Sequence, residues 1–143
     1  MKLTSPHFST IDGPSLAEVA ASIDALTELV HKDAGARDRF LILDADDGSG
    51  AFMQAIAVDS LPHWLIEVSN GDEAALRALR QPTTRGPAVE LLGRFLGGER
   101  SLGNGVDWLD VDRAASRQKM RTPTSFALVL WVIVIAVWWF FRS

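Results

Sequence analysis

The sequence ends in a long apolar segment, and this segment restricts what the chain can fold into more than any other feature. Residues 126–141 read FALVLWVIVIAVWWFF, without a charged side chain, and the uncharged Thr124 and Ser125 precede them. At about 1.5 Å per residue, a helix over 124–141 is roughly 27 Å long, close to the hydrocarbon thickness of a bilayer. A buried core helix is the alternative, but such a helix normally keeps a polar face, which this segment lacks. We therefore predict a transmembrane helix over 124–141, with a tail at 142–143.

Charged and aromatic residues beside this segment predict how it lies in a membrane. The positive charges Arg113, Arg117, Lys119 and Arg121 precede it without an acid among residues 113–123, whereas only Arg142 follows it. The positive-inside rule then places the N-terminal part of the chain in the cytoplasm, and the N-terminus lacks the apolar stretch of a signal peptide. Tryptophan prefers the headgroup level of a bilayer. The residues expected at the membrane interface are Arg117, Lys119, Arg121, Trp138, Trp139 and Arg142. The sequence thus predicts a tail-anchored, single-pass protein of the cytoplasmic membrane.

The charge of the chain is divided unevenly between its two parts. Residues 1–112 hold all 18 acidic residues and nine of the basic ones, a net charge of −9, whereas residues 113–143 carry +5. An acidic domain is repelled by nucleic acid and favours a basic protein partner, while the basic linker 113–123 is attracted to anionic lipids. The chain has no cysteine, which excludes disulfides, thiol nucleophiles and cysteine-based zinc sites. Its three histidines form no ligand pattern with nearby acids, so no metal or cofactor is expected.

Residues 1–112 show the pattern of an α+β domain. Ser15 and Glu18 have the spacing of a capping box, and apolar residues then recur at helical spacing, which predicts a helix from Leu16 to Lys32. The other expected elements are strands at 39–44, 51–58, 64–69 and 106–111, a helix from Pro87 to about 96, and a helical linker at 113–123. Residues 72–80 fit a strand or a short helix, and their composition favours a helix with Asp72 as N-cap. Strands grouped between flanking helices predict a small, mainly antiparallel sheet.

The stretch DADDGSG, residues 44–50, combines three aspartates with two glycines. An apolar strand that ends in Asp-x-Asp resembles the first motif of the haloacid-dehalogenase-like phosphotransferases. This resemblance implies that Asp44 attacks a phosphoryl group and that Asp46 acts as acid and base near magnesium. However, Gly48 replaces the Thr or Val of that motif, and a later Asp pair with its Lys motif is missing. An EF-hand-type calcium loop fails on spacing as well, so a hairpin loop is the preferred interpretation.

Two tryptophans, Trp64 and Trp108, lie next to apolar strands. Packing in the core is the default prediction for both. Tryptophan is also enriched where proteins bind one another, which makes Trp108 a candidate partner-binding residue together with Asp44, Asp46 and Asp47.

The order of the expected elements is similar to that of the small α+β immunity proteins encoded beside bacterial polymorphic toxins. The likeness covers residues 15–112 and depends on a leading helix, a hairpin containing FMQAIAV, the strand WLIEVS, the helix AVELLGRFLGG and the closing VDWLDVD. Proteins of this kind work by stoichiometric binding that blocks a toxin. The membrane anchor departs from their usual soluble form and suggests interception of a toxin as it enters.

These observations favour a non-enzymatic, membrane-anchored module that binds a basic protein partner. A membrane-associated phosphotransferase or hydrolase centred on Asp44 and Asp46 is the alternative. An accessory subunit of a membrane protein complex is a further possibility, although the apolar segment has no glycine-based small-residue face for tight helix pairing.

Overall fold

The computed structural model describes residues 1–33, 38–58, 63–72, 76–100, 102 and 105–111. Contacts group Met1–Val111 into one compact unit and Asp112–Ser143 into a second. The predicted linker, the predicted transmembrane helix and the six predicted membrane-interface residues lie outside the described residues. Among the helices that the structure describes, none is both long and apolar enough to cross a membrane.

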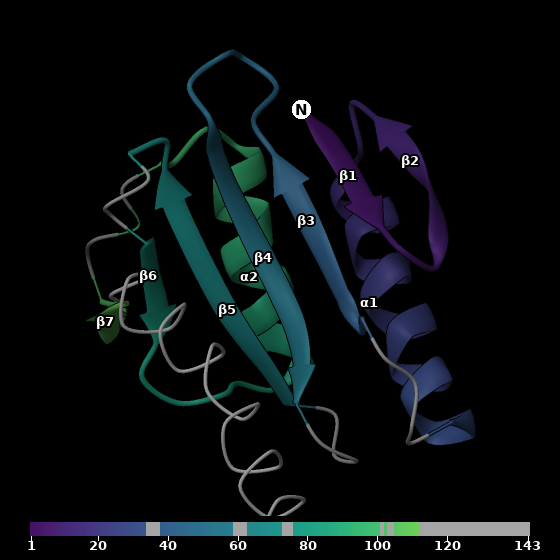
Figure 1. The fold of residues 1–143 in the computed structure, drawn as a ribbon. Coiled ribbons are helices and arrows are strands. Elements are labelled where there is room, and N and C mark those ends of the chain that lie inside the picture. The colour runs from purple at the N-terminus through teal and green to yellow at the C-terminus, as the bar shows by residue number, and fades with distance from the viewer. Residues whose placement is uncertain (34–37, 59–62, 73–75, 101, 103–104, 112–143) are drawn as a thin grey trace, which may run out of the picture. The chain divides into compact units, whose positions relative to one another are not determined.

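The first unit is built on a seven-stranded antiparallel sheet with the order β2-β1-β3-β4-β5-β6-β7 (Figure 1). The strands are β1 (Lys2–Ser5), β2 (Phe8–Asp12), β3 (Phe40–Asp44), β4 (Ala51–Val58), β5 (His63–Asn70), β6 (Leu76–Leu79) and β7 (Trp108–Asp110). Consecutive strands from β3 to β7 pair with each other, while the N-terminal hairpin β1–β2 is added beside β3. The sheet is therefore a meander whose first hairpin occupies one edge.

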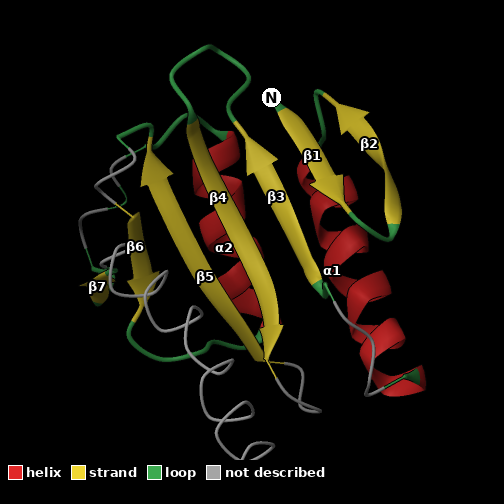
Figure 2. Ribbon diagram, in the orientation of Figure 1, coloured by secondary structure: helices red, strands yellow, loops and turns green. Residues whose placement is uncertain are grey.

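Two helices, α1 (Leu16–Lys32) and α2 (Arg85–Leu96), lie on the same face of the sheet (Figure 2). Helix α1 begins with a complete capping box, in which the backbone N–H of Ser15 donates to the Glu18 carboxylate at 2.7 Å and the Ser15 hydroxyl accepts from the Glu18 N–H. Leu16 passes over Gly93 of α2, where an added Cβ would lie 3.0 Å from Leu16 Cδ1. The small residue thus allows the helices to approach each other.

The core lies between the helices and one face of the sheet. Helix α1 contributes Val19, Ile23, Leu26 and Val30, helix α2 contributes Ala88, Leu91, Leu92 and Phe95, and the central strands contribute Leu41, Leu43, Met53, Ala55, Ala57, Trp64, Ile66 and Val68. Strand β4 presents mainly alanines to the helices, and its bulkier Phe52, Ile56 and Val58 point to the opposite face and are partly buried. This alternation follows from the period of two in a strand.

The predicted α+β class with an antiparallel sheet is confirmed. The helix Leu16–Lys32 and the strand 51–58 have the predicted bounds, and the helix expected from Pro87 begins two residues earlier. The preference for a helix in residues 72–80 is wrong, because Leu76–Leu79 form β6, in which Ala78 pairs with Glu67 of β5. Strand pairing here overrides the helical preference of Ala, Leu and Arg, which is weak for four residues.

Candidate functional site: an acidic hairpin tip

The three aspartates of the candidate site lie on the loop that joins β3 to β4. We call Asp44, Asp46 and Asp47 the acidic tip. The loop is closed where the Ala45 N–H donates to the Ala51 carbonyl at 2.9 Å, and Asp46 has a φ of +52°. Asp44 Oδ1 accepts the Asp46 N–H at 2.7 Å. The predicted hairpin loop is thus present, and one of its aspartates stabilises the backbone of another.

Asp47 repeats this local arrangement at the far side of the loop. Its Oδ1 accepts the Ser49 N–H at 2.9 Å and also the Ser49 hydroxyl. These hydrogen bonds from Ser49 are the main cause that lowers the pKa of Asp47, with a smaller contribution from Arg100. The carboxylate of Asp47 therefore remains ionised to a lower pH than an ordinary aspartate.

A single ammonium group from β1 lies among the carboxylates on the other side of the tip. Lys2 pairs in register with Asp12 of β2 and with Asp44 of β3, and its Nζ lies 3.1 Å from Asp46 Oδ1. The hydrogen bond to Asp46 is the largest cause that raises the pKa of Lys2, and the charges of Asp12 and Asp44 add to it. One positive charge faces three negative charges here, so the cluster keeps an excess of negative charge.

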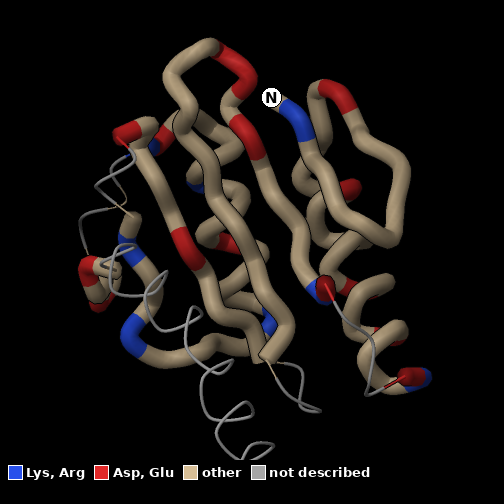
Figure 3. The backbone as a smooth tube through the Cα atoms, in the orientation of Figure 1, with Lys and Arg blue, Asp and Glu red and all other residues tan. Residues whose placement is uncertain are grey.

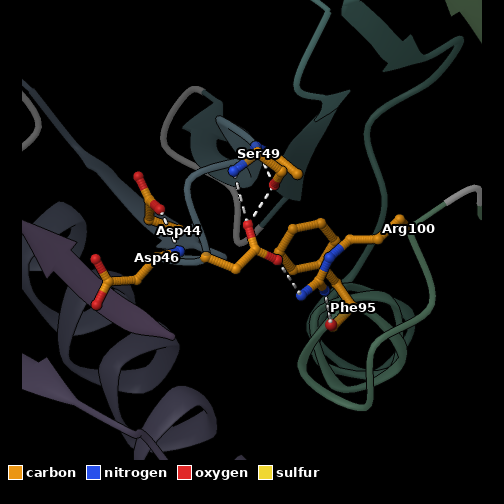
Figure 4. Close-up of polar contacts among 7 residues, drawn as sticks. Asp44, Asp46, Ser49, Phe95 and Arg100 are labelled. Carbon is orange, nitrogen blue, oxygen red and sulfur yellow. Dashed lines mark hydrogen bonds and ion pairs between the residues drawn. The ribbon is translucent and has the colours of Figure 1, made fainter.

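Arg100, from the segment after α2, contacts Asp47 of the acidic tip (Figure 4). Its Nη2 lies 3.8 Å from Asp47 Oδ2, its Nη1 donates to the Phe95 carbonyl at 2.7 Å, and its guanidinium carbon lies 4.4 Å from the centre of the Phe95 ring. Because Phe95 is fully buried in the core, these contacts connect the tip to the end of α2. An exposed ion pair of this kind contributes little stability, but it positions Asp47.

A close backbone contact fixes the tip against the turn after β5. Gly71 has a φ of +100°, and a Cβ built on it would lie 2.0 Å from the carbonyl oxygen of Ser49. Only glycine fits at this position without moving one of the two segments. Gly71 also donates its N–H to the Ser69 hydroxyl at 3.3 Å. The loop of the acidic tip is therefore contacted by Lys2 of β1 and by the turn after β5.

The acidic tip presents its carboxylates to solvent at fixed positions. The side chains of Asp46 and Asp47 are 44% and 50% exposed, so their carboxylates reach solvent while their positions are held. Further acidic residues lie near the end of the sheet where the β3–β4 loop is found (Figure 3). Among the described residues, no three His, Cys, Asp or Glu side chains are grouped to hold a metal ion. Furthermore, β3 has antiparallel neighbours on both sides, whereas the phosphotransferase resemblance implies a parallel sheet.

The structure does not bring Trp108 to the acidic tip. Trp108 lies on the edge strand β7, and its indole N–H donates to the Leu102 carbonyl at 2.8 Å. The guanidinium of Arg77 lies 5.7 Å from its ring centre, and the side chain is partly buried against the core. Trp64 is fully buried, as predicted. Trp108 thus has a packing role at one sheet edge and is separate from the aspartates.

Sequence reasoning missed Lys2 and Arg100, which lie far along the chain from the loop that they contact. Comparisons of the chain with protein-family models, with curated proteins and with solved structures found no match. The acidic tip, with its two basic contacts, is therefore described from this chain alone.

Proposed function

We propose that the protein is a membrane-anchored binding module whose acidic tip captures a basic segment of another protein. The observation that carries this proposal is the fixed arrangement of Asp44, Asp46 and Asp47, which are held by local hydrogen bonds and remain partly exposed. Positions fixed before binding reduce the entropy that association costs. A partner rich in Lys and Arg would gain complementary charge at this end of the sheet.

The surplus of negative charge around the tip supports a basic rather than an acidic partner. Lys2 and Arg100 each contact one of the three aspartates, and Asp12 adds a further acid beside Lys2. Residues 1–112 as a whole carry a net charge of −9. This balance would accelerate the approach of a basic protein and oppose nucleic acid. Neutralisation of a toxin in the manner of an immunity protein fits this recognition, and we propose it as the biological role.

The enzyme alternative has less support from the geometry. Asp44 Oδ1 accepts the backbone N–H of Asp46 and so takes part in shaping the turn, which leaves Oδ2 as the oxygen for any attack on a phosphoryl group. Asp46 in turn interacts with Lys2. We therefore propose that both residues act in binding and in shaping the loop.

Paired substitutions separate the two functions. The full chain in neutral maltoside detergent is titrated with a fluorescent peptide of alternating Lys and Ser, and phosphoesterase activity is measured in parallel. Asp44→Asn with Asp46→Asn keeps the oxygens that accept hydrogen bonds but removes two charges from the tip. Glu28→Gln with Glu90→Gln removes the same charge from exposed positions on the helices.

We expect the tip variant to bind the Lys/Ser peptide roughly tenfold more weakly at low ionic strength, and the helix variant to bind within about twofold of the wild type. Equal weakening by both variants would mean that net charge, and not the tip, attracts the peptide. Phosphoester turnover that disappears in the tip variant would instead establish the enzyme.

The membrane anchor is a separate part of the proposal. We propose that residues 124–141 span the cytoplasmic membrane, that residues 113–123 lie beside anionic lipid, and that residues 1–112 face the cytoplasm. Resistance of the full chain to alkaline extraction from membranes is the expected result. In sealed right-side-out vesicles the N-terminal unit should resist external protease, and its digestion would refute the orientation.

A further inference from the structure

The two edges of the sheet differ in how well they are protected against pairing with a further strand. Strand β2 forms one edge and β7 forms the other, and among the described strands each pairs with a single neighbour (Figure 1). At the β2 edge the register with β1 shifts between Leu3 and Ser5, where β2 has one residue more than its partner. A bulge of this kind bends an edge strand and hinders the addition of another one. The β2 edge is therefore protected.

The β7 edge is regular by comparison. Its three residue pairs with β6 follow one another without a register shift. The ladder also extends beyond β7 itself, because the Arg80 N–H donates to the Asp107 carbonyl at 3.1 Å and the Val111 N–H donates to the Leu76 carbonyl at 2.8 Å. The sequence 107–111 contains neither proline nor lysine, the residues that often blunt an edge strand. We call residues 107–111 the β7 edge.

The phase of these hydrogen bonds identifies the backbone groups that face outward. In an antiparallel ladder, residues alternate between those whose N–H and C=O groups point to one side of the strand and those whose groups point to the other. Asp107 and Val111 bond toward β6, and Leu109, two residues from each, has the same orientation. The backbone N–H and C=O groups of Trp108 and Asp110 therefore point away from β6, toward the open side of the edge.

An apolar side chain lies in the middle of the β7 edge. Leu109 is 47% exposed, and the part of the chain that the structure describes has only one other large hydrophobic residue that is exposed, Leu16 on α1. A regular edge that also presents an exposed leucine is a template for pairing with another chain.

A second copy of the chain matches the β7 edge in its hydrogen bonding. When two β7 strands pair antiparallel about a two-fold axis at Leu109, Trp108 of each copy lies opposite Asp110 of the other. These are the two residues whose backbone groups point outward, so the pairing can form four backbone hydrogen bonds. Each Leu109 then lies directly opposite its symmetry mate, and the two exposed side chains cover each other.

The local charge also suits a second copy. Arg77 lies opposite Asp110, and Arg80 pairs with Asp107 at 2.9 Å, so the charges of these four residues cancel. A neutral edge does not attract the basic segment that the acidic tip is proposed to bind, and it does not oppose a copy of itself. We infer that the β7 edge joins two copies of the chain by antiparallel pairing of β7 with β7, centred on Leu109. The interface is small and belongs to the weak, reversible class. This inference goes beyond the proposed function and does not use the acidic tip.

A single-cysteine variant tests the pairing directly, because the chain itself has no cysteine. The full chain with Leu109→Cys, in neutral maltoside detergent, is oxidised with copper phenanthroline. Opposite Cα atoms in a pair without hydrogen bonds lie about 4.5 Å apart, which a disulfide can span. Leu16→Cys is the matched control, because Leu16 is 48% exposed but lies on α1. We expect Leu109→Cys to form linked dimers at least fivefold faster than Leu16→Cys.

An exchange of charges at the same position tests the register. Leu109→Lys and Leu109→Glu each place two like charges at the two-fold axis, and each should raise the dissociation constant of the dimer roughly tenfold in sedimentation velocity. A mixture of the two variants should dimerise at least as well as the wild type, which also shows that both variants are folded. Leu16→Lys and Leu16→Glu should leave the dissociation constant within about twofold of the wild type.

Three results would overturn the inference. Equal rates of cross-linking at positions 109 and 16 would mean that the cysteines meet by random collision. A wild-type chain that stays monomeric, or a dimer that both charged Leu109 variants leave unchanged, would show that the β7 edge does not join two copies. Failure of the Lys and Glu variants to associate on mixing would show that residue 109 does not lie opposite itself. These results leave the proposed function intact, because the Leu109 variants keep the acidic tip and should bind the Lys/Ser peptide as the wild type does.

Discussion

Replacement of Gly71 by alanine tests whether the acidic tip is held by the turn after β5. The backbone at Gly71 has a φ of +100°, which costs an alanine about 1–2 kcal/mol. In addition, the new Cβ would lie 2.0 Å from the Ser49 carbonyl oxygen, although carbon and oxygen atoms ordinarily stay about 3.3 Å apart. One of the two segments must therefore move by about 1 Å, and misfits of this size cost about 1–3 kcal/mol.

The sum predicts a destabilisation of about 2–5 kcal/mol for Gly71→Ala. Gly48→Ala is the matched control, because Gly48 also has a positive φ, +78°, but no described atom lies within 4 Å of the place that its new Cβ would take. Only the backbone cost of about 1–2 kcal/mol applies there. Since about 1 kcal/mol shifts the melting temperature of a unit of this size by roughly 4–8 °C, the two variants should differ by at least that amount.

Thermal unfolding followed by near-ultraviolet circular dichroism measures this difference in the full chain. Gly71→Ala should also weaken binding of the Lys/Ser peptide, because movement of Ser49 disturbs the hydrogen bonds that position Asp47. Melting temperatures that are equal for Gly71→Ala and Gly48→Ala would refute the reasoning. The turn after β5 would then give way to the new side chain without strain.

Three further predictions concern single contacts. Ser15→Ala removes the N-cap of α1 and should cost about 1 kcal/mol, whereas Ser22→Ala, a mid-helix control, should be close to neutral in the same melts. Asp24→Asn breaks the bidentate ion pair between Asp24 of α1 and Arg85 of α2. In this pair, the hydrogen bonds from Arg85 hold the pKa of Asp24 below its ordinary 3.8. The wild type should therefore be slightly more stable than this variant at neutral pH, and urea titrations should show the difference vanish as the pH falls through the lowered pKa. Lys2→Met should strengthen Lys/Ser peptide binding roughly twofold to fivefold at low salt, and Lys32→Met, which changes the same charge on α1, should not.

The parts of the fold that the sequence predicts well are those set by local interactions. Helix α1 is marked by its capping box and by apolar residues at helical spacing, and these signals involve neighbours within one or two turns. Strand β4 shows the strand period over eight residues. The hairpin loop is similarly evident, because Asp44 and Asp47 bond backbone groups only two residues away.

The parts that the sequence does not reveal depend on distant pairing. Strands β1 and β2 are short, and β1 is placed in the sheet by its pairing with β3, about 40 residues later. Strand β6 is built from residues that favour a helix and becomes a strand because β5 offers it a partner. The contact of Lys2 with the acidic tip follows from the placement of β1, and that of Arg100 follows from the position of the end of α2. No local sequence pattern predicts these contacts, because Lys2 and Arg100 are far along the chain from the aspartates that they contact.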